Sequence, residues 1–199
     1  ILKKILNMKI LHNLSKDKFS KEIIEIVFPE LKHFKIFFNL NSYAKKLVNE
    51  VDFIFLISLL VIDETDNTDY FLYKFNLSKK DQKRIKSLDD FYKEKILSKK
   101  LTKKELNKIF YYKGREVLVD ILNFKIFKTK KIDNDIIELF NFYSYRKMPI
   151  LPIKAETLIE RYKIKQGKTL GDKLKLIEAE WVKNDFHIYD QQIEAIMKN

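Results

Sequence analysis

The sequence contains no cysteine, and it has only three glycines and three prolines among its 199 residues. The absence of cysteine excludes a disulfide framework, a thiolate metal site and a cysteine nucleophile. The three histidines, His12, His33 and His187, lie far apart and form no i, i+4 pair. We therefore predict no metal site and no cofactor bound to this chain.

A hydrophobic run long enough to cross a membrane is also missing. The longest run, FIFLISLLVI over residues 53–62, is about half the length of a transmembrane helix and lies between Asp52 and Asp63. Because lysines interrupt the first residues, we expect no signal peptide there. We expect a buried core helix at this run, a cytoplasmic location and no membrane partner. Because the chain begins at Ile1, already in a helical pattern, we expect that a part N-terminal to it is missing.

Positive charge is abundant, but arginine is rare. The net charge is +12, and of the 40 basic residues only Arg84, Arg115, Arg146 and Arg161 are arginine. Because A+T-rich codons favour lysine, the lysine excess has two interpretations that stay open: solvated helix faces, or a polyanionic partner. An arginine retained against such a bias indicates a need for its planar, bidentate guanidinium group.

Apolar residues recur at helical spacing along the chain, and no segment alternates over the length of a strand. We predict an all-α fold with helices over residues 2–13, 16–27, 30–39, 42–62, 79–97, 103–112, 115–127, 134–145, 155–163, 170–184 and 189–197. The predicted N-caps are Ser15, Ser78, Thr102 and Asp133. Residues 70–75, YFLYKF, are interpreted as helix or extended linker, and residues 63–69, DETDNTD, as a polar loop.

The clearest boundary is KMPILP, residues 147–152, where two prolines prevent a helix from continuing. We therefore divide the chain into neck-like helices over residues 1–40, a helical body over residues 41–147 and a small helical tail over residues 148–199.

Two of the three glycines, Gly167 and Gly171, stand together in the tail. The Gly-Lys-Thr that begins at Gly167 is not a phosphate-binding loop of the nucleotide hydrolases, because Tyr162 occupies the place of the first required glycine. We expect instead a helix, a turn at Gly167 and a second helix that Thr169 caps together with Asp172. The second helix should bury one apolar stripe, formed by Leu170, Leu174, Ile177 and Trp181.

These glycines allow two interpretations. Glycine at a helix start lets N–H groups approach a phosphate, helped by the helix dipole. Alternatively, Gly167 is the C-cap of the first helix and Gly171 allows two tail helices to pack closely.

No catalytic site is predicted. The pair Asp133 and Asp135 has the Asp-x-Asp spacing that holds Mg²⁺ in nucleotidyl transfer. It lies, however, at a predicted helix start without a neighbouring strand or Gly-Ser loop, so we interpret it as a helix cap.

The order of four stretches resembles the C-terminal helical portion of the bacterial tRNA nucleotidyltransferase and poly(A) polymerase family, the CCA-adding enzymes. NLSKDKFSKEIIEIV resembles the neck motif at Ser15, Lys18 and Glu22, although the family prefers arginine at Lys18. LSKKDQKRIKSL and YYKGREVLVDIL resemble two body elements. The fourth stretch, MPILPIKAETLIERYKIKQGKTLGDKLKLIEAEWVKNDF, resembles the tail.

The resemblance implies a body and tail that position tRNA or another RNA for addition of nucleotides to its 3′ end. It also implies an N-terminal catalytic head, absent from this chain, that binds Mg²⁺ and ATP or CTP, so this chain alone should be inactive. The expected RNA contacts are Arg115, Arg146, Arg161, Lys165, Lys168, Lys173, Gly167 and Gly171.

Two alternatives stay open. The chain could be a stand-alone helical protein-interaction module without RNA binding, in which each arginine pairs with a carboxylate such as Glu116 or Glu160. Membrane attachment through the basic helix at residues 79–100 is disfavoured by its acidic residues.

Overall fold

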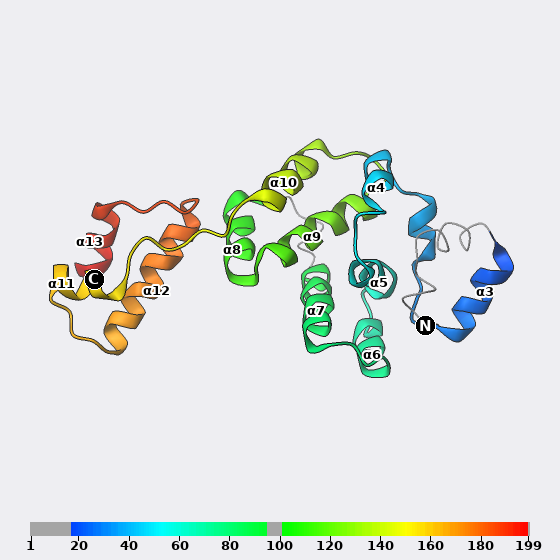
Figure 1. Ribbon diagram of the computed structural model, residues 1–199, viewed down its shortest axis with the longest axis horizontal. Helices are drawn as coiled ribbons and strands as arrows, with labels where there is room; N and C mark the ends of the chain where they lie inside the picture. The colour runs from blue at the N-terminus through cyan, green and yellow to red at the C-terminus, as the bar shows by residue number, and fades with distance from the viewer. Residues whose placement is uncertain (1–16, 95–100, 199) are drawn as a thin grey trace. The chain divides into compact units, whose positions relative to one another are not determined.

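The computed structural model describes residues 17–94 and 101–198, and every regular element within these two ranges is helical (Figure 1). The prediction of an all-α fold is confirmed. The predicted helix at residues 2–13 and the predicted cap Ser15 lie outside the described residues. The elements are α3 (Lys18–Val27), the 3-10 helix η1 (Phe34–Phe38), α4 (Ser42–Leu47), α5 (Phe53–Val61), α6 (Asn67–Lys74), α7 (Lys79–Lys93), α8 (Lys103–Lys113), α9 (Arg115–Lys128), α10 (Asn134–Tyr145), α11 (Ala155–Tyr162), α12 (Lys168–Lys183) and α13 (Asp190–Lys198).

The chain forms two compact units. Unit 1 is built from residues up to Lys100 and from Val119–Tyr145, and unit 2 from Leu101–Leu118 and Arg146–Asn199. Helix α9 therefore contributes its first residues to unit 2 and the rest to unit 1. The predicted division into neck, body and tail at residues 40 and 147 stays a prediction.

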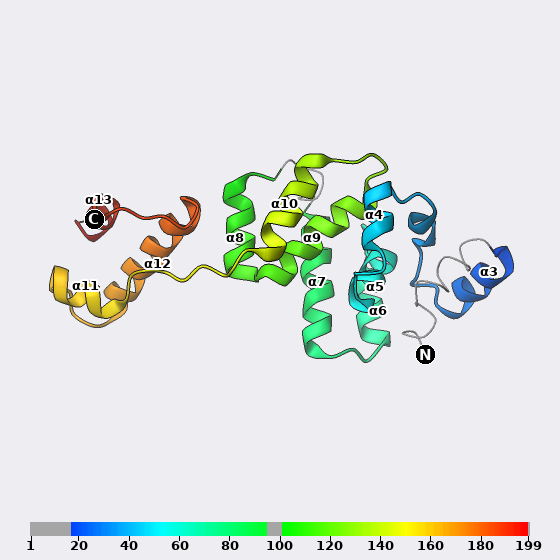
Figure 2. The ribbon, with the colours of Figure 1, turned by 45° about the horizontal axis from the view of Figure 1, so that its top comes forward.

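Helix α5 is the centre of unit 1, as its uninterrupted apolar sequence predicts. Residues Phe55 to Val61 are all buried. The helices α5, α6 and α7 pack on one another, and both views show α6 beside α7 (Figure 1 and Figure 2). The buried core helix predicted at this run is confirmed.

The single long helix predicted over residues 42–62 is wrong. It is divided into α4 and α5 because Asp52 begins a new helix, its carboxylate accepting the N–H of Phe55 at 2.9 Å. Before it, the N–H groups of Glu50 and Val51 both return to the carbonyl of Leu47, which ends α4 in a turn.

The helix predicted over residues 30–39 is also wrong in its first part, and only η1 forms. The N–H of Lys32 donates to the carbonyl of Leu60 at 3.0 Å, and the amide of Asn67 donates to the carbonyl of Glu30 at 2.9 Å. These contacts hold residues 30–32 against the end of α5 and the start of α6 in a conformation that is not helical. In contrast, YFLYKF is helical through Lys74, as part of α6, and the predicted loop at residues 63–69 ends where α6 begins at Asn67.

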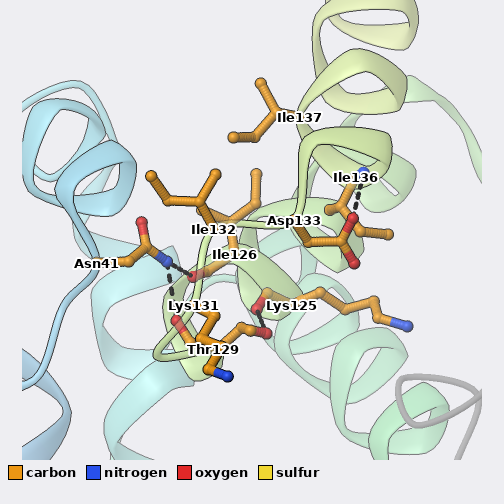
Figure 3. Close-up of a pocket in the computed structure, with 9 residues that line it drawn as sticks. All are labelled: Asn41, Lys125, Ile126, Thr129, Lys131, Ile132, Asp133, Ile136 and Ile137. Atoms are coloured by element: carbon orange, nitrogen blue, oxygen red, sulfur yellow. Dashed lines mark hydrogen bonds between the residues drawn. The ribbon is translucent and has the colours of Figure 1, made fainter.

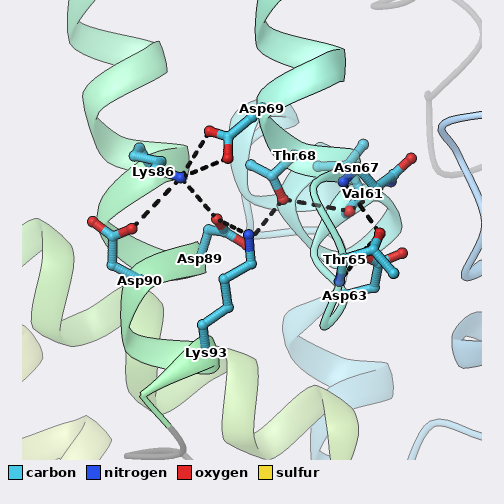
Figure 4. Close-up of polar contacts among 10 residues, drawn as sticks. All are labelled: Val61, Asp63, Thr65, Asn67, Thr68, Asp69, Lys86, Asp89, Asp90 and Lys93. Atoms are coloured by element: carbon cyan, nitrogen blue, oxygen red, sulfur yellow. Dashed lines mark hydrogen bonds and ion pairs between the residues drawn. The ribbon is translucent and has the colours of Figure 1, made fainter.

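A polar cluster around the buried Asp89 joins α6 to α7 (Figure 4). The carboxylate of Asp89 is fully buried and accepts the hydroxyl of Thr68 at 3.0 Å. Lys86 and Lys93 lie 3.3 and 3.1 Å from the same carboxylate, and Lys86 also reaches Asp69 at 2.7 Å. Because these partners neutralise the charge of Asp89, the cluster ties the two helices together.

Asn41 connects α4 to the end of α9 (Figure 3). Its side-chain oxygen accepts the N–H groups of Tyr43 and Ala44, which makes it the N-cap of α4. Its amide nitrogen donates to the carbonyls of Ile126 and Thr129, each at 2.8 Å. One buried side chain thus caps the start of one helix and the end of another.

The same close-up shows Asp133 at the start of α10. Its carboxylate accepts the N–H of Ile136 at 3.2 Å, so the interpretation of Asp133 as a helix cap is confirmed (Figure 3). The predicted caps Ser78 and Thr102 are confirmed too, and Thr102 forms a capping box with Glu105.

Arg84 fixes α7 against α9 and the start of α5. Its Nε and Nη2 donate to the two carboxylate oxygens of Asp120 at 2.5 and 2.8 Å, and its Nη1 donates to Asp52 at 2.5 Å. The Arg84 side chain is only 13% exposed. Burial alone would lower the pKa of Arg84, but its two carboxylate partners raise the pKa instead, so the guanidinium stays charged.

Candidate nucleic-acid interface

In unit 2 the helices α11, α12 and α13 share a small apolar core. Its buried members are Leu158 from α11, Leu170 and Ile177 from α12, and Ile193 from α13. Leu174 packs against this core and Trp181 is buried. The apolar stripe predicted for the second tail helix is therefore confirmed.

The turn between α11 and α12 depends on two unusual backbone conformations. Helix α11 ends at Lys163, which takes a left-handed conformation with φ 54° and ψ 28°. Gly167, with φ 154° and ψ −165°, directly precedes α12. Only glycine adopts that second conformation at little cost, because it has no Cβ atom. This explains why one of the three glycines lies here.

Three details of the predicted turn are wrong. Gly167 rather than Thr169 is the N-cap of α12, without any side-chain hydrogen bond, and Thr169 lies inside the first helical turn. Lys163 rather than Gly167 is the C-cap of α11. At Gly171, a Cβ atom would meet no heavy atom within 4 Å, so close helix packing does not account for this glycine.

Basic side chains point outward from this turn. The stretch RYKIKQGK, residues 161–168, contains no acidic residue, and Arg161, Lys163, Lys165 and Lys168 are all exposed. We call it the basic loop. Between its cations, Tyr162 and Ile164 pack against the apolar core. The alternation of inward apolar and outward basic residues holds the cations on the surface.

The start of α12 adds to the positive potential of the basic loop. Because Gly167 provides no side-chain cap, no side chain accepts the first N–H groups of α12, which are left for solvent or a ligand. The dipole of a helix places partial positive charge at this end. The combination of Lys168 with the first N–H groups of α12 is suited to an anion such as a phosphate.

Arg161 lies in the basic loop but also braces α11 against α13. Its guanidinium is 3.0 Å from Asp190 and 3.4 Å from Glu194, and its side chain is 43% exposed. The hydrogen bond from Arg161 to Asp190 raises the pKa of the guanidinium. Its carboxylate partners are therefore on α13, and not at Glu160.

Arg146 is an anchor inside unit 2. Its guanidinium lies 3.3 Å from the carboxylate of Asp185 and is placed over the rings of Phe186 and Phe110, 4.8 and 5.9 Å from their centroids. Asp185 also accepts from Lys103. Burial alone would raise the pKa of Asp185, but its hydrogen bonds and these two cations lower the pKa, so the carboxylate stays charged.

Three other predicted RNA contacts, Lys173, Arg115 and Gly171, lie outside the basic loop. Lys173 donates to the carbonyl of Ile196 at 2.7 Å, near the end of α13. Arg115 is exposed at the start of α9, outside the basic loop, and Gly171 lies inside α12. Neither Lys165 nor Lys168 makes an ion pair with any residue that the structure describes.

Of the three neck residues, the structure describes Lys18 and Glu22. Glu22 is exposed on α3, and Lys18 is the first residue of that helix. Ser15 lies outside the described residues. The role that the resemblance implies for these three residues stays a prediction.

Sequence reasoning missed the partners of the arginines. Asp185 follows the end of α12 and takes a left-handed conformation with φ 58°. Nothing in the local pattern relates it to Lys103 or Arg146. For Arg84 a signal was present, because Asp120 interrupts the apolar sequence VLVDIL of α9 and so needs a cationic partner.

The described residues were also compared with the requirements of a metal site and of a membrane-spanning helix. Within residues 17–94 and 101–198, no group of three or more His, Asp or Glu side chains is placed to hold a metal ion. No helix in those ranges has the length and apolar character to cross a membrane.

Comparison with known proteins gives one match. The family model described as tRNA nucleotidyltransferase domain 2 matches residues 46–197, from α4 to α13, which is most of the chain. No curated protein and no solved structure matches the sequence.

Proposed function

Since the chain belongs to the tRNA nucleotidyltransferase domain 2 family, we propose that it holds RNA for an enzyme that adds nucleotides to RNA 3′ ends. The match confirms the family resemblance for the body and tail motifs, and the neck motif at Ser15, Lys18 and Glu22 lies before the matched residues. On this proposal, Mg²⁺ and the nucleotides ATP or CTP are bound by a catalytic head that this chain does not contain. The carboxylate that could have suggested a metal site here, Asp133, is occupied as a helix cap.

The basic loop is the observation that supports RNA binding most directly. It presents three exposed lysines, Lys163, Lys165 and Lys168, without an acidic residue in the same stretch and directly at the start of α12, where Gly167 provides no side-chain cap. Lysine ammonium groups and helix N–H groups bind phosphate without reading base sequence. We therefore propose that the basic loop contacts the RNA backbone, and that it binds tRNAs of different sequence with similar affinity.

Lys165 and Lys168 are the best residues for a test because neither has an intramolecular ion pair among the described residues. For a duplex, the slope of log affinity against log salt concentration should become shallower by about 0.9 for each phosphate that a lysine no longer neutralises. The double variant Lys165→Ala, Lys168→Ala should therefore bind tRNA more weakly and with a slope shallower by about two units. The measurement is filter retention of labelled tRNA across a salt series.

A matched control removes the same charge elsewhere. Lys45 and Lys46 are exposed on α4 in unit 1, and the variant Lys45→Ala, Lys46→Ala should change the slope less than the basic-loop variant does. Equal effects would show that only net charge matters and would remove the basic loop from the interface. If the unaltered chain retains no tRNA even at low salt, the RNA proposal is wrong and the protein-interaction alternative takes its place.

A separate experiment tests the proposal that the catalytic groups lie outside this chain. The chain incubated with tRNA lacking its 3′ terminus, CTP, ATP and Mg²⁺ should incorporate no nucleotide. Incorporation by the purified chain would show that the catalytic groups are within it.

A further inference from the structure

In unit 2 the exposed ring of Tyr112 lies close in sequence to three exposed cations, Lys108, Lys113 and Arg115. Lys108 and Tyr112 are four residues apart on α8, so they share a helix face, and both are exposed. Tyr112 is 51% exposed. Lys113 ends α8, and Arg115 begins α9 directly after Gly114.

The ring of Tyr112 contacts a well-anchored neighbour. It meets the ring of Tyr111 edge to face, with centroids 5.1 Å apart and planes at 79°. Tyr111 itself contacts Trp181 at 5.3 Å, and its hydroxyl donates to Glu178 at 2.7 Å. Because Trp181 is buried, this chain of contacts fixes Tyr111 and supports one side of the exposed ring. An aromatic ring ordered in this way loses little conformational freedom when a ligand stacks on it.

The cations around Tyr112 are available. Lys108, Lys113 and Arg115 are exposed, and none of them makes an ion pair with a residue that the structure describes.

The nearby carboxylates already have partners. Glu178 accepts the hydroxyl of Tyr111, and Glu105 closes the capping box at Thr102. Glu116 is exposed and has an interaction of its own. Among the described residues, the positive charge of Lys108, Lys113 and Arg115 is therefore not neutralised by ion pairs.

We propose that Tyr112 stacks on an unpaired nucleobase of the bound RNA, while Lys108, Lys113 and Arg115 hold the flanking phosphates. An aromatic face beside unpaired cations matches the chemistry of single-stranded RNA, because every base presents a π-face and every linkage a negative charge. The basic loop, which has no exposed aromatic ring, would bind backbone alone. This inference rests on the proposed function and adds a contact with the bases.

The experiment uses the full chain and an RNA hairpin whose unpaired loop carries 2-aminopurine, a base whose fluorescence falls on stacking. A blunt duplex of equal length is the second probe. The unaltered chain should quench the loop fluorophore. Tyr112→Leu keeps an apolar contact with Tyr111 but removes the aromatic face, and it should lose the quenching and weaken hairpin binding by about tenfold. Tyr112→Phe should behave as the unaltered chain, because stacking does not need the hydroxyl group.

Tyr73→Leu is the matched control. Tyr73 is 90% exposed on α6 in unit 1, and its replacement should change neither quenching nor affinity. The duplex should bind the chain and its Tyr112→Leu variant equally.

The outcomes separate this inference from the proposed function. If the chain binds tRNA through the basic loop but Tyr112→Leu leaves quenching and hairpin affinity unchanged, the stacking site is refuted and the proposed function stands. If the chain binds neither tRNA nor the hairpin, the stacking site and the proposed function are both refuted. If Tyr112→Leu weakens hairpin and duplex binding equally, the residue supports the fold or the backbone contacts, and stacking is refuted.

Discussion

Replacement of the two tail glycines by alanine should change stability in opposite directions. Gly167 has φ 154° and ψ −165°, a conformation that an alanine adopts only with a strain of about 1–3 kcal/mol. Gly171 lies in the first turns of α12, and a Cβ atom there would meet no heavy atom within 4 Å. Alanine is more favourable than glycine inside a helix by about 0.8–1.0 kcal/mol. The two variants should therefore differ in unfolding free energy by about 2–4 kcal/mol.

The single tryptophan makes this difference measurable. Trp181 is in α12 and is 2% exposed, so its fluorescence reports the unfolding of unit 2. In equilibrium urea unfolding, the midpoint of Gly167→Ala should lie below that of the unaltered chain, and the midpoint of Gly171→Ala above it. The slopes should stay equal, because neither change alters the surface exposed on unfolding.

Either variant can refute the reasoning. A Gly167→Ala protein with an unchanged midpoint would mean that residue 167 does not hold the conformation described. A Gly171→Ala protein that is destabilised by more than about 0.5 kcal/mol, beyond the range of a neutral surface change, would mean that another segment packs closely on α12. That result would restore close packing as the explanation of Gly171.

Three further predictions concern unit 1, each measured as a free energy of unfolding by far-UV circular dichroism. Asp120→Ala removes the two hydrogen bonds that the buried guanidinium of Arg84 makes with Asp120 and should cost about 3–5 kcal/mol. Asn41→Ala removes the cap of α4 and leaves two carbonyls at the end of α9 without their donor, at a cost of about 3 kcal/mol. His33 has its pKa lowered, first by burial and then by Lys128, so the unfolded chain takes up the proton first, and stability should fall as the pH drops below 6.5. His33→Gln should flatten this pH dependence.

Asp190→Ala is the control for Asp120→Ala. It also removes a carboxylate from an arginine, Arg161, but both side chains are exposed, so little stability should be lost. A loss of less than about 1 kcal/mol for Asp120→Ala, as is usual for a surface ion pair, would show that Arg84 is hydrated rather than buried. An unaltered pH profile in His33→Gln would assign the acid sensitivity to carboxylates such as Asp63, whose pKa is lowered by hydrogen bonds from Thr65 and Lys32 that outweigh the effect of burial.

The elements that could be predicted are those whose stabilising contacts are local. Residues within one or two helical turns of each other determine three of these elements: the capping box at Thr102, the cap at Ser78 and the buried helix α5. The wrong prediction over residues 30–39 depends on a distant contact, because the N–H of Lys32 bonds to Leu60 at the end of α5. The division at Asp52 is local, since Asp52 caps α5 through Phe55, and the continuous helical spacing of residues 42–62 concealed it. The second role of Asn41, its bond to Ile126 85 positions away, is also distant. Periodicity in a short window contains no information about such partners.

At the candidate interface, too, the sequence predicts the local features and not those that depend on distant contacts. That the tail contains a helix, a turn and a second helix follows from apolar spacing and from the glycines. The exchange of roles between Thr169 and Gly167 does not follow, because the two assignments shift the start of the helix by only two positions along the same sequence. The exposure of Lys163 and Lys165 follows from Tyr162 and Ile164 packing inward, which only the assembled core determines.

The different uses of arginine and lysine connect the fold with the proposed function. In a chain rich in lysine, a retained arginine indicates a need for its planar guanidinium, and three of the four arginines meet that need inside the protein. Arg84 binds Asp120 and Asp52, Arg146 binds Asp185, and Arg161 binds Asp190 and Glu194.

The lysines of the basic loop make no such pairs among the described residues and stay exposed. A point charge on a flexible stem suits a phosphate backbone, whose contacts need charge more than fixed geometry. In this chain three arginines therefore pair with carboxylates of the fold, and lysine is the residue that we expect at the RNA. Arg115, exposed and without an ion pair among the described residues, is the arginine that joins the lysines, beside Tyr112.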